Sequence, residues 1–251
     1  MESQPLVSVI MPSFNAEKYI AASIESVLQQ TYGNWELIIT DDCSSDRTPE
    51  IAQSYSEQDH RINFVVAKQH SGIAQTRNQS IARAKGRFMA FIDNDDLWVP
   101  NKLEKQVDFI LKHGFAFVYS AYELINEDGT PKGKTIQTAG VINYNKYLRN
   151  TIIGSGTIML DLEKTGSLQM PNNATSDDMA LWCKILKDGH NAYPMKEVLM
   201  KYRVRNNSAS ANKLKAAKDV WLVYRKQEKL PFFRAMACFV GYAFNAFKKR
   251  L

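Results

Sequence analysis

Cysteine is scarce in this 251-residue sequence, and so are long apolar runs. The three cysteines, Cys43, Cys183 and Cys238, stand far apart and form no Cys-x-x-Cys pair. Their odd number and wide spacing exclude a disulfide framework and suit reduced thiols in a cytosolic setting. Because no uncharged apolar stretch reaches the roughly 18 residues that a bilayer requires, we expect no transmembrane helix.

Several common catalytic motifs are also missing. Without a Gly-x-x-x-x-Gly-Lys-Ser/Thr loop or a Gly-x-Ser-x-Gly turn, a P-loop nucleoside triphosphatase and a serine hydrolase are disfavoured. Residues 154–156 lack the third glycine of a dinucleotide-binding fingerprint. Residues 1–4 carry one acid and no base, so we expect no signal peptide. The histidines show no metal-ligand spacing and are interpreted as structural or surface residues: His60, His70, His113 and His190.

The composition that remains is that of an ordinary globular protein, with 45% hydrophobic and 23% charged residues. The net charge is +6, and the excess is concentrated at the C-terminus. The segment from Lys213 to the end has ten lysines and arginines and two acids, so it carries +8 and the rest of the chain −2. Such a segment bears on binding partners rather than on fold.

Short apolar runs alternate with helical patterns over the first part of the chain. The runs predict strands at 7–11, 35–40, 62–67 and 88–92. The periodicity predicts helices at 17–30, after residues 45–47, and at 72–84, the last with Ile73, Ile81 and Ala84 facing inward. Strands that are apolar throughout and alternate with helices indicate a parallel sheet covered on both faces. We therefore predict an α/β fold with a mostly parallel sheet and helices on both faces.

The alternation weakens in the second part of the chain. Helices are expected at 101–112 and 177–187, strands at 115–119 and 198–204, and a turn at 127–129. No repeat, low-complexity tract or linker precedes the basic C-terminal segment. We therefore divide the chain into one domain of residues 1–210 and a basic, aromatic, helical extension of residues 211–251.

Acidic residues end two of the expected strands. Ligands of parallel sheets bind at the carboxyl ends of the strands, so Asp42 and the segment from Asp93 to Asp96 mark an expected site. Asp93 and Asp95 suit Mg²⁺ or Mn²⁺ bridged to a diphosphate, or else they form a solvated turn that caps the next helix. Asp42 can accept hydrogen bonds from a nucleobase or a ribose, or it can have a capping role in the following turn.

Two helices carry further candidate residues. Arg77 is either a cation near a bound nucleotide or part of a solvated ion pair. Asp177 and Asp178 begin the 177–187 helix, where the helix dipole favours acids in any case. Their functional interpretation is that one of them is the general base for an acceptor hydroxyl.

The segment 231–248 has the periodicity of an amphipathic helix. Its polar side carries Arg234, Gly241, Asn245 and Lys248. The helix is too short to span a bilayer, but it suits one that lies in the interface of an anionic membrane. The alternative is packing on its own domain or on a partner subunit. Its apolar side comprises Phe232, Phe233, Met236, Phe239, Val240, Ala243, Phe244 and Phe247.

The order and spacing of these motifs resemble the family 2 inverting glycosyltransferases of the GT-A (Rossmann-like) fold, up to about residue 210. Residues 7–15, 26–32 and 35–39 resemble the opening strand, loop and second strand of that family. Residues 41–46 are similar to its Asp-Asp-x-Ser-x-Asp signature, and residues 72–78 to its helix ending in Ala-Arg-Asn. Residues 93–96 resemble the DxD site, and residues 176–182 the segment that holds the catalytic acids.

The resemblance implies a nucleotide-sugar donor, with uridine as the expected base. Pro12 and Phe14 would line the base pocket. Asp42 and Arg77 would contact the base, and Asp93 would lie near the ribose.

The resemblance also implies a metal-dependent, single in-line displacement at the anomeric carbon. Asp95 would ligate Mn²⁺ or Mg²⁺, which neutralises charge on the leaving nucleoside diphosphate. Asp178 or Asp177 would deprotonate the acceptor hydroxyl, and the Glu-Asp pair frequent in the family favours Asp178. Many relatives have a histidine near Arg205. An arginine is no metal ligand at neutral pH but pairs with a diphosphate, which leaves the third metal ligand open.

Small members of this family commonly extend bacterial surface polysaccharides (O-antigen, capsule, exopolysaccharide) on polyprenyl-diphosphate carriers. We therefore expect transfer of a hexosyl unit to a hydroxyl of a lipid-linked glycan. The protein would be cytoplasmic and peripheral on the inner face of the plasma membrane, held to anionic lipid by its tail. The alternatives are a nucleotidyltransferase-like enzyme and a non-catalytic basic membrane-binding module. No nucleic-acid partner is expected, because the basic residues form no groove-sized patch with stacking aromatics.

Overall fold

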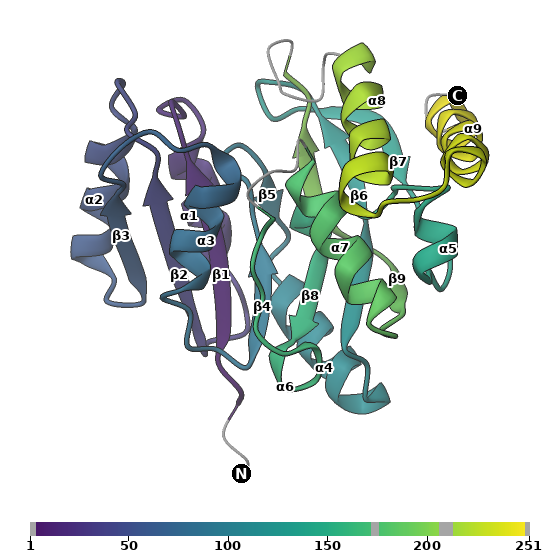
Figure 1. Ribbon diagram of the computed structural model, residues 1–251. Coiled ribbons are helices and arrows are strands. Elements are labelled where there is room, and N and C mark those ends of the chain that lie inside the picture. The colour runs from purple at the N-terminus through teal and green to yellow at the C-terminus, as the bar shows by residue number, and fades with distance from the viewer. Residues whose placement is uncertain (1–3, 172–175, 206–212, 249–251) are drawn as a thin grey trace.

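The computed structural model describes residues 4–171, 176–205 and 213–248 (Figure 1). Its strands are β1 (Val7–Ser13), β2 (Trp35–Asp41), β3 (Ile62–Val66), β4 (Phe88–Phe91), β5 (Leu97–Trp98), β6 (Phe117–Ile125), β7 (Pro131–Ile136), β8 (Ile158–Asp161) and β9 (Ala192–Arg203). Its helices are α1 (Ile20–Leu28), α2 (Thr48–Gln58), α3 (Ile73–Ile81), α4 (Lys102–His113), α5 (Tyr144–Tyr147), α6 (Leu162–Thr165), α7 (Asp177–Lys187), α8 (Lys213–Leu222) and α9 (Phe232–Lys248). A 3₁₀ turn (Ser155–Thr157) precedes β8, and a π-helical turn (Val223–Gln227) follows α8.

The strands form a single sheet in the order β3-β2-β1-β4-β8-β6-β9-β5, with β7 paired to β6. The first four of these are parallel to one another. Strand β8 then runs antiparallel to both β4 and β6, whereas β9 is parallel to β6 and β5 antiparallel to β9. The α/β class is thus confirmed, but the sheet is parallel throughout only in its first half. It becomes mixed where β8 enters with the opposite direction.

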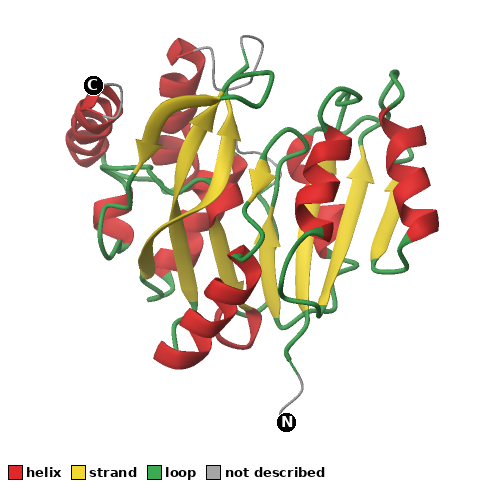
Figure 2. Cartoon of the chain, turned by 180° about the vertical axis from the view of Figure 1, so that it is seen from behind, coloured by secondary structure: helices red, strands yellow, loops and turns green. Residues whose placement is uncertain are grey.

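Strands β1, β2 and β4 are largely apolar because both of their faces are buried, whereas β3 at the edge of the sheet is mostly exposed. Ile10 and Ile38 contribute to a cluster that also contains residues of α3, α7 and the C-terminal helices. The neighbouring Val9 and Leu37 point to the opposite face, where the core includes residues of α1, α2 and α4. Figure 1 shows the face covered by α3 and α7, and Figure 2 shows the molecule from behind. The sheet is therefore the middle layer of three.

The helices of the first half lie within a few residues of their predicted positions, and α7 spans the predicted residues. One side chain differs. Ile73 was expected to face inward but is 51% exposed, because it is the first residue of α3 and lies at the rim of a cleft. Ile81 and Ala84 are partly buried against the core, as predicted.

The second half contains elements that the periodicity did not predict. Strands β5 and β8 and the helices α5 and α6 have only two to four residues each, too few to show a period. The turn expected at 127–129 is confirmed, since it joins β6 to β7 as a hairpin. Gly129 in this turn has a φ of 89°, which favours glycine.

The C-terminal helices pack on the sheet-and-helix body rather than standing apart from it. Val220, Tyr224, Ala235 and Cys238 are buried in the same core cluster as α7. The predicted boundary between residues 210 and 211 lies outside the described residues. No described helix is both long and apolar enough to cross a membrane.

Helix α9 has one face on the protein and one in solvent. On the predicted polar side, Gly241 and Asn245 contact Arg149, whose carbonyl accepts a hydrogen bond from Asn245 Nδ2 at 3.1 Å. Phe239, which the periodicity places on the apolar side, is partly buried against the core. The solvent face carries exposed apolar side chains, which we call the α9 stripe: Phe233, Met236, Val240, Phe244 and Phe247.

Candidate active site

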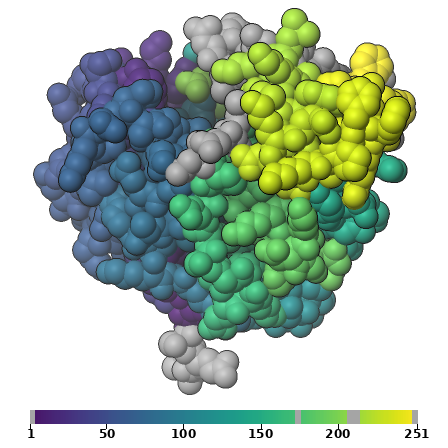
Figure 3. Space-filling view, viewed as in Figure 1, coloured from purple at the N-terminus to yellow at the C-terminus, as the bar shows by residue number. Residues whose placement is uncertain are grey.

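A cleft of about 630 Å³ opens at the carboxyl ends of β1, β2 and β4. Its wall is formed by loops after these strands, by α3, by the start of α7 and by α8. Figure 3 shows the molecule in space-filling form, viewed as in Figure 1, with the blue N-terminal half against the green and yellow C-terminal half. The cleft brings together all nine residues that the sequence singled out: Pro12, Phe14, Asp42, Arg77, Asp93, Asp95, Asp177, Asp178 and Arg205.

The two aspartates at the end of β2 have different surroundings. Asp41 is fully buried and accepts hydrogen bonds from Ser13 Oγ and from the backbone and hydroxyl of Ser44, so it fixes the loop. Asp42 lines the cleft, and its carboxylate accepts the backbone N–H groups of Ser71 and Gly72 at 2.8 Å each. These N–H groups lie at the start of α3, where the helix dipole stabilises negative charge. The Asp42 carboxylate is therefore fixed in position at the cleft wall.

Aromatic and apolar surface lies beside Asp42. Phe14 is 47% exposed, and its ring centre lies 4.8 Å from that of His70. His70 Nδ1 lies 3.0 Å from Asp42 Oδ2. His70, which the sequence analysis interprets as structural or surface, is 60% exposed and lines the cleft. With Ile73 exposed nearby, this end of the cleft offers flat apolar surface next to an acceptor, as a nucleobase requires.

Arg77 lies between the apolar end of the cleft and the acids that follow β4. Its guanidinium Nη2 donates to Asp93 Oδ1 at 2.7 Å, and its side chain is only 5% exposed. Burial alone would lower the pKa of Arg77, but Asp93, Asp178 and Asp177 raise it above its usual value. The cation is therefore permanent and lies between the two groups of acids.

The segment after β4 contains one acid for structure and one for the cleft. Asp96 is buried and accepts the backbone N–H of Arg203 at 2.9 Å, so it attaches this segment to the end of β9. Asp95 lines the cleft, and its Oδ2 lies 2.6 Å from Arg205 Nε in an ion pair. Burial, followed by repulsion from Asp93, raises the pKa of Asp95 to about 6 despite the nearby Arg205.

Asp177 and Asp178 enter the cleft from the first turn of α7. Asp178 Oδ2 accepts a hydrogen bond from Ser155 Oγ at 3.0 Å, and its Oδ1 accepts the Met179 N–H at 2.8 Å. Asp177 Oδ1 is buried without a hydrogen-bond partner among the described residues. Burial raises the pKa of Asp177 to about 6, against the opposing effect of Arg77.

Ser155 is a site residue that the sequence did not reveal. The missing third glycine excludes a phosphate loop at residues 154–156, and their pattern indicates no other role. They form the 3₁₀ turn before β8, where Trp98 Nε1 donates to the Gly156 carbonyl at 3.0 Å. A Cβ on Gly156 would lie 2.6 Å from the Met200 side chain, so glycine permits this close approach. The turn thereby holds Ser155 against Asp178.

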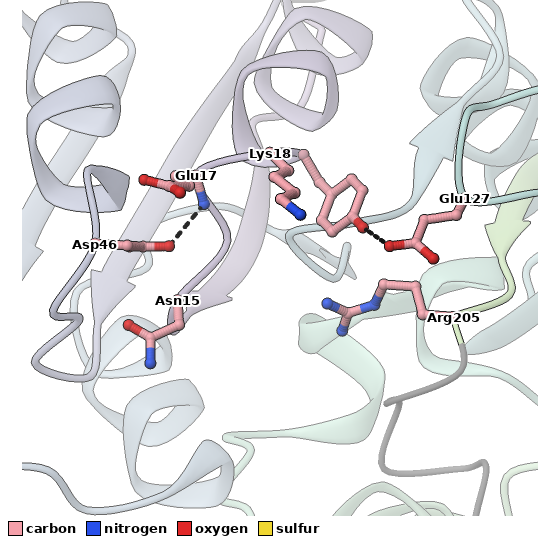
Figure 4. Close-up of a pocket in the computed structure, with 7 residues that line it drawn as sticks. Asn15, Glu17, Lys18, Asp46, Glu127 and Arg205 are labelled. Atoms are coloured by element: carbon pink, nitrogen blue, oxygen red, sulfur yellow. Dashed lines mark hydrogen bonds between the residues drawn. The ribbon is translucent and has the colours of Figure 1, made fainter.

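A second cavity of about 340 Å³ adjoins the cleft and shares Arg205 with it (Figure 4). Figure 4 shows Asn15, Glu17, Lys18 and Asp46 on one side and Glu127 and Arg205 on the other. The Tyr19 hydroxyl donates to Glu127 across this cavity, and so connects the start of α1 with the β6–β7 hairpin.

A metal site of three or more His, Cys, Asp or Glu side chains does not occur within residues 4–171, 176–205 and 213–248. Asp95 lines the cleft beside Asp93, and its contact with Arg205 is an ion pair without hydrogen-bond geometry. Mg²⁺ and Mn²⁺ are often held by one or two carboxylates, with waters and substrate phosphates supplying the other oxygens. The donor set therefore fits a metal that binds together with a diphosphate.

Comparison with known proteins identifies the family of this chain. A family model described as glycosyl transferase family 2 matches residues 8–169. The putative teichuronic acid biosynthesis glycosyltransferase TuaG of Bacillus subtilis (strain 168) is 50% identical over 248 residues, which are 99% of this chain and 98% of that relative. An Escherichia coli protein, UDP-Glc:alpha-D-GlcNAc-diphosphoundecaprenol beta-1,3-glucosyltransferase WfgD, is 43% identical over 217 residues, 86% of this chain and 84% of that relative.

Solved structures share the fold at low sequence identity. S. aureus TarS 1–349 in complex with UDP-GlcNAc superposes with a TM-score of 0.72 at 17% identity, covering 96% of this chain and 72% of that one. The mannosyltransferase PcManGT from Pyrobaculum calidifontis, in complex with GDP-Man and Mn²⁺, gives a TM-score of 0.72 at 18% identity, with 99% and 72% covered.

The fold is thus that of the GT-A class. Within that class, the chain belongs to glycosyl transferase family 2. The two alternatives, a nucleotidyltransferase-like enzyme and a non-catalytic basic module, are set aside by this membership. The predicted resemblance and the predicted fold are both confirmed.

Proposed function

We propose that this protein is an inverting glycosyltransferase that moves a hexosyl unit from a UDP-sugar to a hydroxyl of a lipid-linked glycan during assembly of a bacterial surface polysaccharide. The observation that carries the proposal is the single cleft that unites the base-sized apolar end at Phe14, the acids after β4 and the aspartate pair of α7. Transfer needs these three parts in one place, because the donor sugar, its leaving diphosphate and the acceptor hydroxyl meet at the anomeric carbon.

The donor would lie along the carboxyl ends of β1, β2 and β4. Pro12 and Phe14 line the base, while Asp42 accepts the imide N–H of uracil. Its carboxylate already accepts two backbone N–H groups, which fix its direction. Arg77 contacts the base edge and orients Asp93 toward the ribose. UDP as the nucleotide is supported by the UDP-Glc and UDP-GlcNAc in the names of similar proteins.

Asp95 would hold Mn²⁺ or Mg²⁺ together with the donor diphosphate. When bound, such a metal neutralises negative charge on the leaving diphosphate. Arg205 supplies a second, permanent cation at the same end of the cleft.

Asp178 is the base in this proposal. It removes the proton of the acceptor hydroxyl as that oxygen bonds to the anomeric carbon, while the bond from this carbon to the β-phosphate oxygen breaks. Ser155 and the Met179 N–H hold the carboxylate in one orientation. Asp177 helps to balance the buried Arg77 cation, whose charge opposes the effect of burial on the pKa of Asp177.

A lipid-linked acceptor is supported by the relative WfgD, whose name gives GlcNAc-diphosphoundecaprenol as its acceptor. The C-terminal segment fits such a substrate. Helix α8 contributes Lys215, Ala216 and Asp219 to the cleft wall, and the α9 stripe is exposed beyond it. We propose that the stripe and the surrounding lysines and arginines dock on anionic lipid at the cytoplasmic face of the plasma membrane.

A transfer assay tests this function. The protein is incubated with Mn²⁺, each UDP-hexose in turn and a GlcNAc-diphosphate-lipid acceptor, and the product is examined for inversion by NMR. We expect Asp178→Asn to lower kcat by about 10³-fold or more, since the loss of a general base has effects of this size. The matched variant Asp177→Asn should retain most of kcat. Equal loss in both variants, or a retained anomeric configuration, would contradict the assignment.

A further inference from the structure

Arg205 occupies the junction between the main cleft and the second cavity. On the cleft side its Nε lies 2.6 Å from Asp95 Oδ2. On the other side its guanidinium carbon lies 5.3 Å from the centre of the Tyr19 ring, within cation–π range. Figure 4 shows the side chain reaching into the second cavity. The guanidinium therefore has favourable surroundings on both sides.

The neighbouring Arg203 differs from Arg205 because its side chain is held by hydrogen bonds. Its Nε donates to the Asp95 carbonyl at 2.7 Å, and its Nη1 donates to the Glu127 carbonyl at 2.8 Å. Arg205 Nε, by contrast, makes its ion pair without hydrogen-bond geometry and has no hydrogen-bond partner among the described residues. The backbone of the junction is thus held by Arg203. Within the described part of the chain, Arg205 is held by its charge, through Asp95 and the Tyr19 ring, and an ion pair of this kind can be replaced.

The second cavity offers the displaced guanidinium other partners. Glu17, Asp46 and Glu127 line it, against one lysine, Lys18. The cleft offers a further partner when a nucleoside diphosphate is bound, because arginine binds phosphate oxygens through two parallel hydrogen bonds. Departure of Arg205 from Asp95 is therefore compensated on either side.

We propose that Arg205 is a resident counter-ion of Asp95, which a divalent cation must displace in order to bind. The inference rests on the metal role proposed for Asp95. Two cations cannot share one carboxylate oxygen without strong repulsion, so the metal alone competes with Arg205. A nucleoside diphosphate removes this competition, since it gives Arg205 a new anionic partner. Metal and nucleotide consequently favour each other's binding, and by linkage the effect is reciprocal.

Replacement of Arg205 by a neutral side chain separates this role from a structural one. Mn²⁺ binding is titrated without nucleotide by electron paramagnetic resonance, and UDP binding is titrated without metal by calorimetry in EDTA. For Arg205→Gln we expect Mn²⁺ to bind at least fivefold more tightly than in the wild type, and UDP at least fivefold more weakly. Damage to the fold would weaken both, whereas loss of a counter-ion moves them in opposite directions.

Two variants and one measurement on the wild type complete the experiment. Arg205→Lys keeps the charge and should keep wild-type Mn²⁺ affinity, and Arg47→Gln, which removes an exposed arginine on α2's N-terminal side, should change neither affinity. In NMR spectra of the wild type, the side-chain N–H resonance of Arg205 should shift when Mg²⁺ and UDP are added together. Unchanged or weaker Mn²⁺ binding in Arg205→Gln, or an unchanged signal, overturns the inference. If the wild type binds no Mn²⁺ even with UDP, the metal role of Asp95 itself fails.

Discussion

At the scale of the residue, the neighbouring acids of α7 show how surroundings separate two chemically identical side chains. Asp178 has a hydroxyl donor and a backbone donor, whereas one oxygen of Asp177 is buried and unpartnered among the described residues. A carboxylate held by two donors has a fixed orientation, which a general base needs in order to reach the acceptor hydroxyl. The sequence left the choice between these two open, because their positions in the chain differ by one residue only.

Ser155 is expected to act as a positioning residue for Asp178. We predict that Ser155→Ala lowers kcat about tenfold, because Asp178 loses the donor that orients it, while the KM for the donor changes little. Ser155→Thr keeps the hydroxyl and should restore most of kcat. Steady-state kinetics of both variants, with UDP affinity measured alongside, tests this. A rise in KM with kcat unchanged would show that Ser155 acts on donor binding instead.

Asp177 carries a cost in stability that depends on pH. Its pKa is raised by burial to about 6, so the folded protein resists ionisation of a group that is ionised in the unfolded chain above about pH 4. Relative to Asp177→Asn, the wild type should thus lose stability as the pH rises through 6. We predict that Asp177→Asn raises the free energy of unfolding by about 1 kcal/mol at pH 8 and by almost nothing at pH 4.

Urea denaturation at both pH values measures this difference. Asp128→Asn is a suitable control, because Asp128 lies in the exposed β6–β7 turn and its pKa is lowered by hydrogen bonds from Thr130. The sign for Asp128 is opposite, so its replacement should not stabilise the protein at pH 8. A stabilisation by Asp177→Asn that is equal at pH 4 and pH 8 would contradict the account.

The sequence predicted site residues where a strand end or a helix start marked them, and missed those without such a mark. Asp42 and Asp95 follow apolar strands, and Arg77 lies on a recognisable helix. His70 lies in a loop with no pattern, and it enters the site only because β3 places it beside Asp42. Ser155 reaches Asp178 across 23 positions of sequence. Contacts of this kind depend on tertiary packing, which local periodicity does not contain.

At the scale of the element, α9 is a helix whose existence the sequence predicted but whose orientation it did not. The periodicity indicates one apolar and one polar face. In the structure the inner face combines small and polar residues, such as Ala235, Gly241 and Asn245, with the aromatic residues Phe239 and Tyr242. Most of the large aromatics lie on the outside. Removal of the whole helix would therefore also expose core residues, which makes point substitutions the better test.

Two substitutions on the α9 stripe test membrane docking. Phe233 and Phe244 are 85% and 67% exposed, so their replacement by serine should leave the melting temperature unchanged. We predict that the double variant binds vesicles of phosphatidylglycerol at least about tenfold more weakly, since each ring contributes roughly 1.5–3 kcal/mol when it is fully buried. Sedimentation with vesicles measures the binding.

Leu111→Ser provides a matched control, because Leu111 is an exposed apolar residue of α4, outside the stripe. It should bind vesicles as the wild type does. If the double variant and the wild type sediment equally, the stripe is not the docking surface. A change in elution volume on gel filtration would indicate instead that the stripe contacts a second copy of the chain.

At the scale of the whole molecule, the first half of the sheet was predictable and the second half was not. Strands β1, β2 and β4 are buried on both faces, and β3 is a half-exposed edge strand. Helices separate all four, so each leaves a separate signal in the sequence. From β8 onward the pairing joins segments distant in sequence, as when β9 lies between β6 and β5. The cleft forms where the two halves meet. Its apolar end at Phe14 lies on the first, predictable half, and Asp177 and Asp178 of α7 lie on the second.

The central claim is that this cleft binds a uridine diphosphate sugar through a metal at Asp95. Calorimetric titration of UDP, GDP, dTDP and NAD, each with and without Mn²⁺, tests it most directly. We predict that UDP binds at least about tenfold more tightly with Mn²⁺ than without it, a difference of about 1.4 kcal/mol, and more tightly than the other three nucleotides. Absence of binding by every nucleotide, or UDP binding that is indifferent to Mn²⁺, would contradict the claim.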